Sequence, residues 1–113
     1  MNREALIQWI ETHTDEMIRD FQALLRAPSV RNDEERAPNA PFGKGVRDAL
    51  DVTLEMGQRF GLNPRDFDGY ACDMTLGDGS EMIASLSHID VVPEGNDWNY
   101  PPFGAEIHDG YIY

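Results

Sequence analysis

Apolar residues recur every three or four positions near the start of the chain, which predicts an amphipathic helix over residues 3–26. Asn2 can cap the start of this helix, and Pro28 disfavours a helical residue before it. Thr12 and Thr14 could restart the helix, so the pattern leaves open one helix or two. The apolar face consists of Leu6, Trp9, Ile10, His13, Met17, Phe21, Leu24 and Leu25.

A second stripe of the same period runs from residue 46 to residue 60 and predicts another helix. Gly61 is well placed as its C-terminal cap. The intervening residues 28–45 are polar, rich in proline and without periodicity. A loop of this length is unusual inside a compact domain. We therefore expect it to be functional, packed against something else, or disordered.

The second half of the chain carries strand patterns. Residues 70–76 alternate between apolar and polar, as in a half-buried strand, and the apolar run 82–87 predicts a buried strand. Residues 105–107 and 111–113 flank a turn sequence and predict a hairpin. Together the elements predict an α/β fold with a mixed sheet flanked by helices. The last strand reaches the final residue, so we expect a truncated domain.

Two ionisable residues, His88 and Asp90, follow the predicted buried strand, where charge is costly unless it is paired. Positions two apart on an extended segment share a face. Imidazole is a good metal ligand, and a nearby carboxylate commonly fixes its tautomer. The alternative is a hydrogen-bonded core histidine with Asp90 capping a turn. Two residues alone do not define a site, because zinc needs three or four protein ligands.

The remaining candidate residues are weaker. His13 belongs to the apolar helix face, and His108, next to a turn, is expected to be exposed. Cys72 has no basic neighbour in sequence, so we expect it to be a packing residue rather than a nucleophile. Three alternating carboxylates are expected to form a solvent face: Asp66, Asp68 and Asp73.

Composition excludes several classes of partner. The chain has 113 residues, with 9 Lys and Arg against 21 Asp and Glu, for a formal net charge of -12. Such a surface repels phosphate backbones and anionic lipid, so neither nucleic acid nor a membrane is expected as a partner. Cys72 is the single cysteine, which rules out an internal disulfide and predicts a reducing, cytoplasmic location.

A longer motif surrounds His88 and Asp90. The sequence H-I-D-V-V-P (residues 88–93) is followed by Trp98, then P-F (102–103) and D-G (109–110). This succession resembles the N-terminal signature of the di-zinc peptidase superfamily of aminoacylases, desuccinylases, glutamate carboxypeptidases and carnosinase-like dipeptidases. Upstream, residues 41–62 and the F-D-G-Y segment (67–70) are similar to the bacterial Xaa-His dipeptidases, with their characteristic P-F-G entry to the helix.

The resemblance implies that His88 is a ligand of one zinc ion and that Asp90 is the carboxylate that orients it. It implies that Trp98, Pro102 and Phe103 pack near the site. Residues 1–113 would then be an incomplete N-terminal segment of a zinc-peptidase catalytic domain, with one of five expected ligands and no lid or dimerisation domain.

By the same resemblance, the full-length parent would hydrolyse the peptide bond of a dipeptide, using water activated by two zinc ions. This chain alone would be inactive, would not retain the zinc, and would self-associate through its uncovered apolar faces. Two alternatives stay open. One is an amidohydrolase of the desuccinylase or deacetylase type, which shares the motif, and the other is a non-catalytic assembly module.

Overall fold

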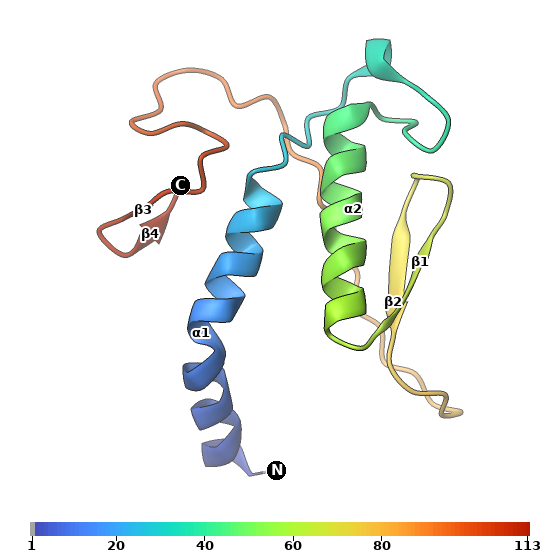
Figure 1. Ribbon diagram of the computed structural model, residues 1–113, viewed down its shortest axis with the longest axis vertical. Helices are drawn as coiled ribbons and strands as arrows, with labels where there is room; N and C mark the ends of the chain where they lie inside the picture. The colour runs from blue at the N-terminus through green and yellow to red at the C-terminus, as the bar shows by residue number, and fades with distance from the viewer. Residues whose placement is uncertain (1) are drawn as a thin grey trace.

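The computed structural model describes residues 2–113, with two helices and two small antiparallel hairpins (Figure 1). Helix α1 spans Arg3–Leu25, the short 3-10 helix η1 spans Asp33–Glu35, and helix α2 spans Lys44–Arg59. The first hairpin pairs β1 (Asn63–Asp66) with β2 (Cys72–Thr75), and the second pairs β3 (Ile107–His108) with β4 (Tyr111–Ile112). Helices and strands are thus combined as expected. Within residues 2–113, however, the strands form two separate antiparallel sheets and not the mixed sheet that the sequence predicted.

Helix α1 is one continuous helix. The Asn2 side chain accepts a hydrogen bond from the backbone N–H of Ala5 at 2.9 Å, which confirms the predicted cap. The hydroxyls of Thr12 and Thr14 donate to carbonyls one turn earlier in the same helix. A threonine that bonds back in this way is compatible with a helix interior, so neither residue restarts the helix.

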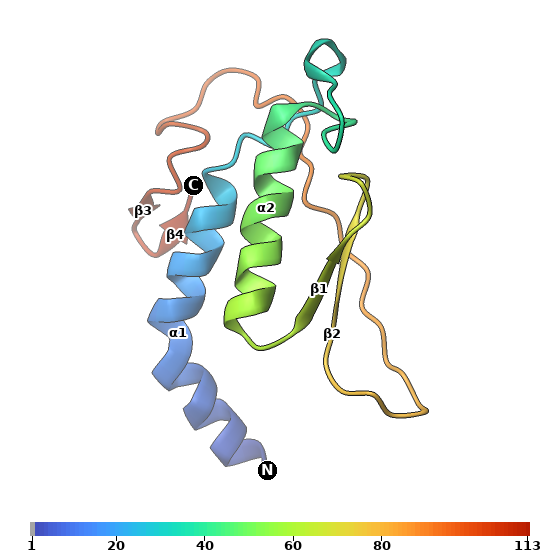
Figure 2. The ribbon, with the colours of Figure 1, turned by 45° about the vertical axis from the view of Figure 1, so that its right-hand side comes forward.

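The apolar face of α1 is largely uncovered. No side chain of this helix is buried, and only its C-terminal half runs beside α2, as Figures 1 and 2 both show. An ion pair between Arg59 and Asp20, at 2.5 Å, joins the two helices. Exposed large apolar residues therefore line α1, namely Leu6, Ile7, Trp9, Ile10, Met17 and Phe21.

Helix α2 supplies most of the buried apolar residues among those described. Val46, Ala49 and Leu50 are buried on the side that the sequence pattern predicted. The helix ends as expected at Gly61, which has φ +73°, while the N–H of Leu62 reaches back to the carbonyl of Gly57 at 2.9 Å. This is the hydrogen-bond pattern of a glycine-terminated helix.

The β1–β2 hairpin packs against α2. Strand β2 confirms a strand within residues 70–76, but the predicted alternation of burial is not seen, because Tyr70 and Leu76 are exposed. Strand β1, with the sequence N-P-R-D, was not predicted. The close approach depends on Gly57, where an added Cβ would lie 2.5 Å from the sulfur of Met74. Gly69 turns the hairpin with φ +78°, and a Cβ there would meet the carbonyl oxygen of Asn39 at 2.0 Å.

A half-buried arginine joins the hairpin to the helix. The side chain of Arg47 is 15% exposed and pairs with Asp51 on its own helix and with Asp66 of β1, the latter at 2.6 Å. The predicted solvent face of carboxylates is confirmed for Asp66 and Asp68, which are exposed, whereas Asp73 is half-buried. Sequence reasoning did not predict that Asp66 and Asp73 pair with arginines. Asp73 pairs with Arg65 across the hairpin.

These contacts predict an acid-sensitive hairpin. The backbone N–H of Gly69, together with Arg47, holds the pKa of Asp66 below its usual value. A carboxyl whose folded-state pKa is depressed stabilises the fold fully above its unfolded value of about 3.9, and that stabilisation is lost as the pH falls through the folded-state pKa. Urea unfolding followed by circular dichroism should therefore show stability falling below about pH 4. Asp66→Asn should make this loss of stability with falling pH smaller, and Asp78→Asn, in an exposed loop, should leave it unchanged. Equal slopes in the two variants would contradict this assignment.

Residues 28–45 form an ordered loop and not a disordered one. The N–H of Asn32 donates to the carbonyl of Phe42 at 2.9 Å, and Ala37 and Ala40 pair in an isolated bridge. Asp33 accepts hydrogen bonds from both Arg31 and Arg36, which closes the turn that contains η1. Local hydrogen bonds thus organise a segment that has no apolar periodicity.

The predicted buried strand at residues 82–87 is wrong. This segment is extended but unpaired, and Met82, Ile83 and Leu86 are among the most exposed apolar side chains described. The apolar pattern is that of a strand, but among residues 2–113 no neighbouring strand supplies the hydrogen bonds that a sheet requires.

The second hairpin is confirmed near the end of the chain. Ile107 pairs with Ile112 and His108 with Tyr111. The segment before it is held to α1 because the Gln22 amide donates to the carbonyl of buried Ala105 at 2.7 Å. In the described part of the chain, no helix is long and apolar enough to cross a membrane.

Candidate functional site

The candidate site lies on an extended segment that returns from the β1–β2 hairpin toward the end of α1 (Figure 2). The sequence predicted that the site follows a buried strand, and this prediction is wrong. Val91 pairs in parallel with Val30, which lies in the loop after α1, through an isolated bridge. His88 and Asp90 are exposed and Ile89 between them is half-buried, so the expected alternation of faces is present.

His88 and Asp90 are in direct contact. The Nδ1 atom of His88 lies 2.9 Å from the backbone carbonyl of Asp90 and 3.2 Å from its carboxylate Oδ1. Both partners are acceptors at neutral pH, so Nδ1 must carry the hydrogen and donate it. The lone pair is then on Nε2, and the side chain is 83% exposed.

This arrangement fits one zinc ligand and no more. An imidazole whose Nδ1–H is held by a carboxylate and a carbonyl presents Nε2 to a metal. Residues 2–113 hold no cluster of three or more His, Cys, Asp or Glu side chains able to bind a metal ion. The remaining ligands of a zinc site would have to come from other residues.

The other two histidines have ordinary packing roles. His13 stacks on Trp9 with ring centroids 4.1 Å apart, at the edge of α1. His108 stacks on Tyr100 at 3.6 Å, and its Nε2 lies 2.7 Å from the carboxylate of Glu106. The prediction that His108 is exposed is therefore wrong, because the hairpin folds its ring against an aromatic neighbour.

Cys72 is a half-buried packing residue, as expected. Burial raises the pKa of its thiol, and the nearby carboxylates of Asp66 and Asp73 raise it further. A raised pKa lowers the fraction of the reactive thiolate at neutral pH, which is the opposite of what a nucleophile needs.

The aromatic and proline residues after the motif lie in the loop that precedes β3. The indole N–H of Trp98 donates to the carbonyl of Glu94 at 2.7 Å and closes a turn, although the side chain is exposed. Pro102 and Phe103 are half-buried. Their proposed packing near a metal site remains a prediction.

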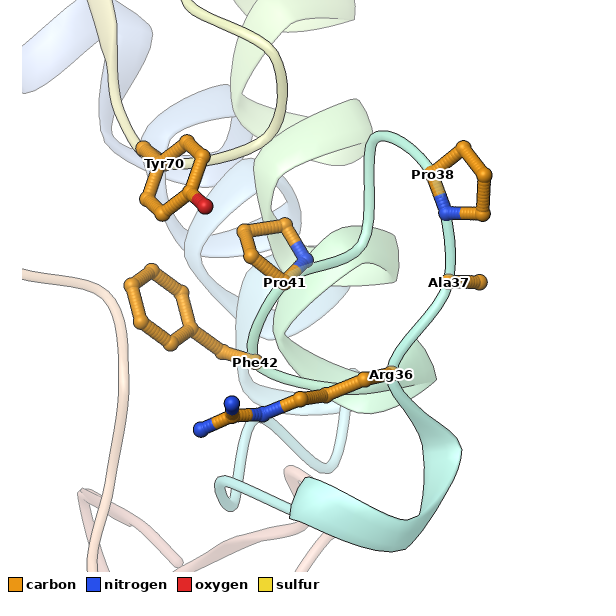
Figure 3. A pocket seen from close by; sticks show the side chains of 6 residues that line it. All are labelled: Arg36, Ala37, Pro38, Pro41, Phe42 and Tyr70. Carbon is orange, nitrogen blue, oxygen red and sulfur yellow. The ribbon is translucent and has the colours of Figure 1, made fainter.

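A shallow surface hollow of about 410 Å³ lies beside the loop before α2 (Figure 3). Phe42 meets Tyr70 edge to face with centroids 5.6 Å apart. Arg36 also lines the hollow, but its guanidinium is paired with Asp33. The P-F-G sequence singled out above thus joins the loop to the hairpin. The hollow is lined by Arg36, Ala37, Pro38, Pro41, Phe42 and Tyr70.

A larger open concavity, of about 1050 Å³, lies between α2, β2 and segment 76–90. Its apolar lining includes Leu50 and Met74, and His88 and Asp90 belong to the same lining. The hydroxyl of Ser29 donates a hydrogen bond to the carbonyl of Ile89 and so anchors segment 76–90. Sequence reasoning missed Ser29, because it lies 60 positions from Ile89 and no local pattern links the two residues.

Comparison with known proteins finds relatives that are named as dipeptidases. No protein-family model matches the chain. Among curated proteins, "Putative dipeptidase YtjP" of Bacillus subtilis (strain 168) is 41% identical over 99 residues, which cover 88% of this chain and 21% of that protein.

Two staphylococcal proteins give the same result. The "Putative dipeptidase" of Staphylococcus epidermidis is 36% identical over 100 residues, covering 88% of this chain and 21% of that protein. "Putative dipeptidase SAUSA300_1697" of Staphylococcus aureus (strain USA300) is 37% identical over 103 residues, covering 91% and 22%. The chain therefore spans about a fifth of the length of the curated relatives it matches.

Proposed function

We propose that this chain is a segment of the catalytic domain of a zinc-dependent dipeptidase, in which His88 binds one zinc ion and Asp90 orients it. The observation that carries the proposal is the contact from His88 Nδ1 to both the carbonyl and the carboxylate of Asp90, which leaves Nε2 exposed. The similarity to proteins named as dipeptidases supports the reaction class.

The chemistry assigned to these residues is limited and specific. Bound zinc would supply Lewis acidity for hydrolysis of a peptide bond. Asp90 holds the hydrogen on Nδ1 and stabilises the ring orientation in which Nε2 faces outward. Because only neutral imidazole binds zinc, protons compete with the metal for His88. With one ligand, residues 2–113 hold zinc weakly, and we propose that this chain alone does not hydrolyse peptides.

The dipeptidase reading is favoured over a deacylase or desuccinylase by the names of the relatives. We further propose that the substrates include Xaa-His dipeptides such as β-alanyl-histidine, because residues 41–62 resemble the Xaa-His dipeptidases. We also propose that the protein works in the cytoplasm, because its single cysteine fits a reducing compartment.

A chimera tests the function. The matched residues of the Bacillus protein are replaced by this chain, and the Bacillus chimera is assayed with dipeptides, N-succinyl and N-acetyl amino acids, before and after metal removal. We expect dipeptide hydrolysis that is lost with a chelator and restored by Zn²⁺. The unmodified Bacillus protein is the control. A folded chimera that cleaves only the acylated amino acids, or that ignores metal removal, would overturn the proposal.

The exposed apolar surface predicts association of this chain with further copies of itself. Ile83 and Leu86 stand on an unpaired extended segment, which is a template for strand pairing. Sedimentation should show oligomers that grow with concentration. Ile83→Lys with Leu86→Lys should shift the population toward monomer more than the matched pair Leu6→Lys with Ile10→Lys on α1. A wild-type chain that stays monomeric across the concentration series would contradict this expectation.

A further inference from the structure

A buried serine far from the motif in sequence holds the His88–Asp90 segment. Ser29 is 4% exposed and follows Pro28 in the loop after α1. Its hydroxyl donates to the carbonyl of Ile89 at 2.7 Å, and its own carbonyl accepts from the N–H of Val91 at 3.1 Å.

These two hydrogen bonds restrain both peptide units next to Asp90. The Ile89 carbonyl belongs to the peptide that precedes Asp90. The Val91 N–H belongs to the peptide that follows it, and that same peptide carries the Asp90 carbonyl contacted by His88 Nδ1. A planar peptide that is held at its N–H or carbonyl has its other polar group fixed as well. Ser29 therefore sets the direction of the acceptor that holds the imidazole.

The anchor is itself rigidly placed. The Ser29 N–H donates to the carbonyl of Ala27 at 2.8 Å. The adjacent Pro28 carbonyl packs so closely on α2 that a Cβ at Gly45 would lie 2.0 Å from its oxygen. The segment that carries His88 is exposed and without a paired strand, so this junction between the helices is its fixed point.

We propose that Ser29 is a positioning residue for the His88–Asp90 pair: its hydroxyl and carbonyl fix the two peptides around Asp90 and thereby the tautomer and direction of the His88 ring. The inference rests on the proposed zinc function for its purpose, but the ring orientation is measurable without metal. Ser29 does not touch the metal or the substrate in this role.

Nitrogen-15 NMR of the imidazole rings in dilute samples of the 113-residue chain tests the inference, at a pH well above the range in which imidazoles take up protons. In the wild type, His88 should be mainly the Nδ1–H tautomer. Ser29→Ala keeps the backbone contact to Val91 but removes the hydroxyl that holds the peptide before Asp90, so His88 should shift part of the way toward the Nε2–H form. Ser29→Thr, which keeps the hydroxyl, should retain the wild-type tautomer. Thr53→Val is the matched control, because it removes a half-buried hydroxyl that donates to the Ala49 carbonyl on α2.

An unchanged His88 tautomer in Ser29→Ala, or an equal shift in Thr53→Val, would overturn the role of Ser29. The Bacillus chimera separates the two proposals, because this chain alone supplies a single ligand and holds zinc weakly. In the chimera, Ser29→Ala should lower the affinity for Zn²⁺ about tenfold, as for loss of a group that orients a ligand. A His88 tautomer that shifts as expected in the 113-residue chain, together with a chimera that ignores metal removal, would overturn the zinc function and leave the positioning role standing.

Discussion

Replacing His88 by alanine in the Bacillus chimera is expected to lower kcat/KM for dipeptide hydrolysis by more than about 100-fold. Removing a group that only orients a metal ligand costs about 10- to 100-fold, and loss of the ligand itself should cost more. Asp90→Asn should fall within that smaller range, because the asparagine still offers a carbonyl oxygen but no charge to the Nδ1–H. The ranking of the two variants follows from the contacts at 2.9 and 3.2 Å.

His13→Ala is the matched control for that comparison. It also removes an imidazole, but one that stacks on Trp9 in α1. Its activity should stay within a few-fold of the chimera, and bound zinc, measured by atomic absorption, should fall only in the His88 variant. A His88→Ala chimera that keeps its zinc and its activity would show that this ring is no ligand.

Gly45→Ala is expected to destabilise the fold by about 1–3 kcal/mol, the usual cost of overpacking. An added Cβ would lie 2.0 Å from the carbonyl oxygen of Pro28, which is backbone and has no flexible side chain to move aside. The roughly 1 kcal/mol that alanine normally gains over glycine within a helix would offset only part of this cost. The helix start or the Pro28–Ser29 turn must therefore shift.

The measurement is urea unfolding followed by circular dichroism, with Gly79→Ala as the matched control. At Gly79 an added Cβ would meet only the Glu81 carbonyl, at 3.9 Å, and the φ angle is not positive. Gly79→Ala should leave the midpoint nearly unchanged. A Gly45→Ala variant at least as stable as the wild type would show that the Pro28–Ser29 turn does not pack closely on α2 at this point. Because Ser29 follows Pro28, the same variant should also disturb the His88 tautomer.

Local patterns predicted the elements that local interactions stabilise. The 3.6-residue period placed both helices, and Asn2 and Gly61 marked their ends through hydrogen bonds that span only a few residues. The β3–β4 hairpin was also predictable, because its strands are joined by a tight turn. By contrast, the loop of residues 28–45 is ordered through hydrogen bonds such as that from Asn32 to Phe42. The pattern of apolar residues does not predict these hydrogen bonds.

The errors have a common cause. The apolar run at residues 82–87 has the composition of a strand, but a strand exists only beside a partner, and residues 2–113 provide none. His108 was assigned to solvent from its neighbouring turn, yet its ring stacks on Tyr100 from eight residues earlier. Strand β1 was missed because N-P-R-D lacks alternation, and its stability comes from Arg47 and the pairing with β2.

By itself, the sequence determined the two helices, the turn chemistry and the spacing that lets His88 and Asp90 share a face, because each depends on residues within about one turn of one another. Only the tertiary structure decided that Asp66 is bound by Arg47, that Gly45 admits the Pro28 carbonyl, and that Ser29 holds the peptides around Asp90. These contacts join residues from 17 to 60 positions apart, and such pairs meet only when the folded chain brings their backbones together.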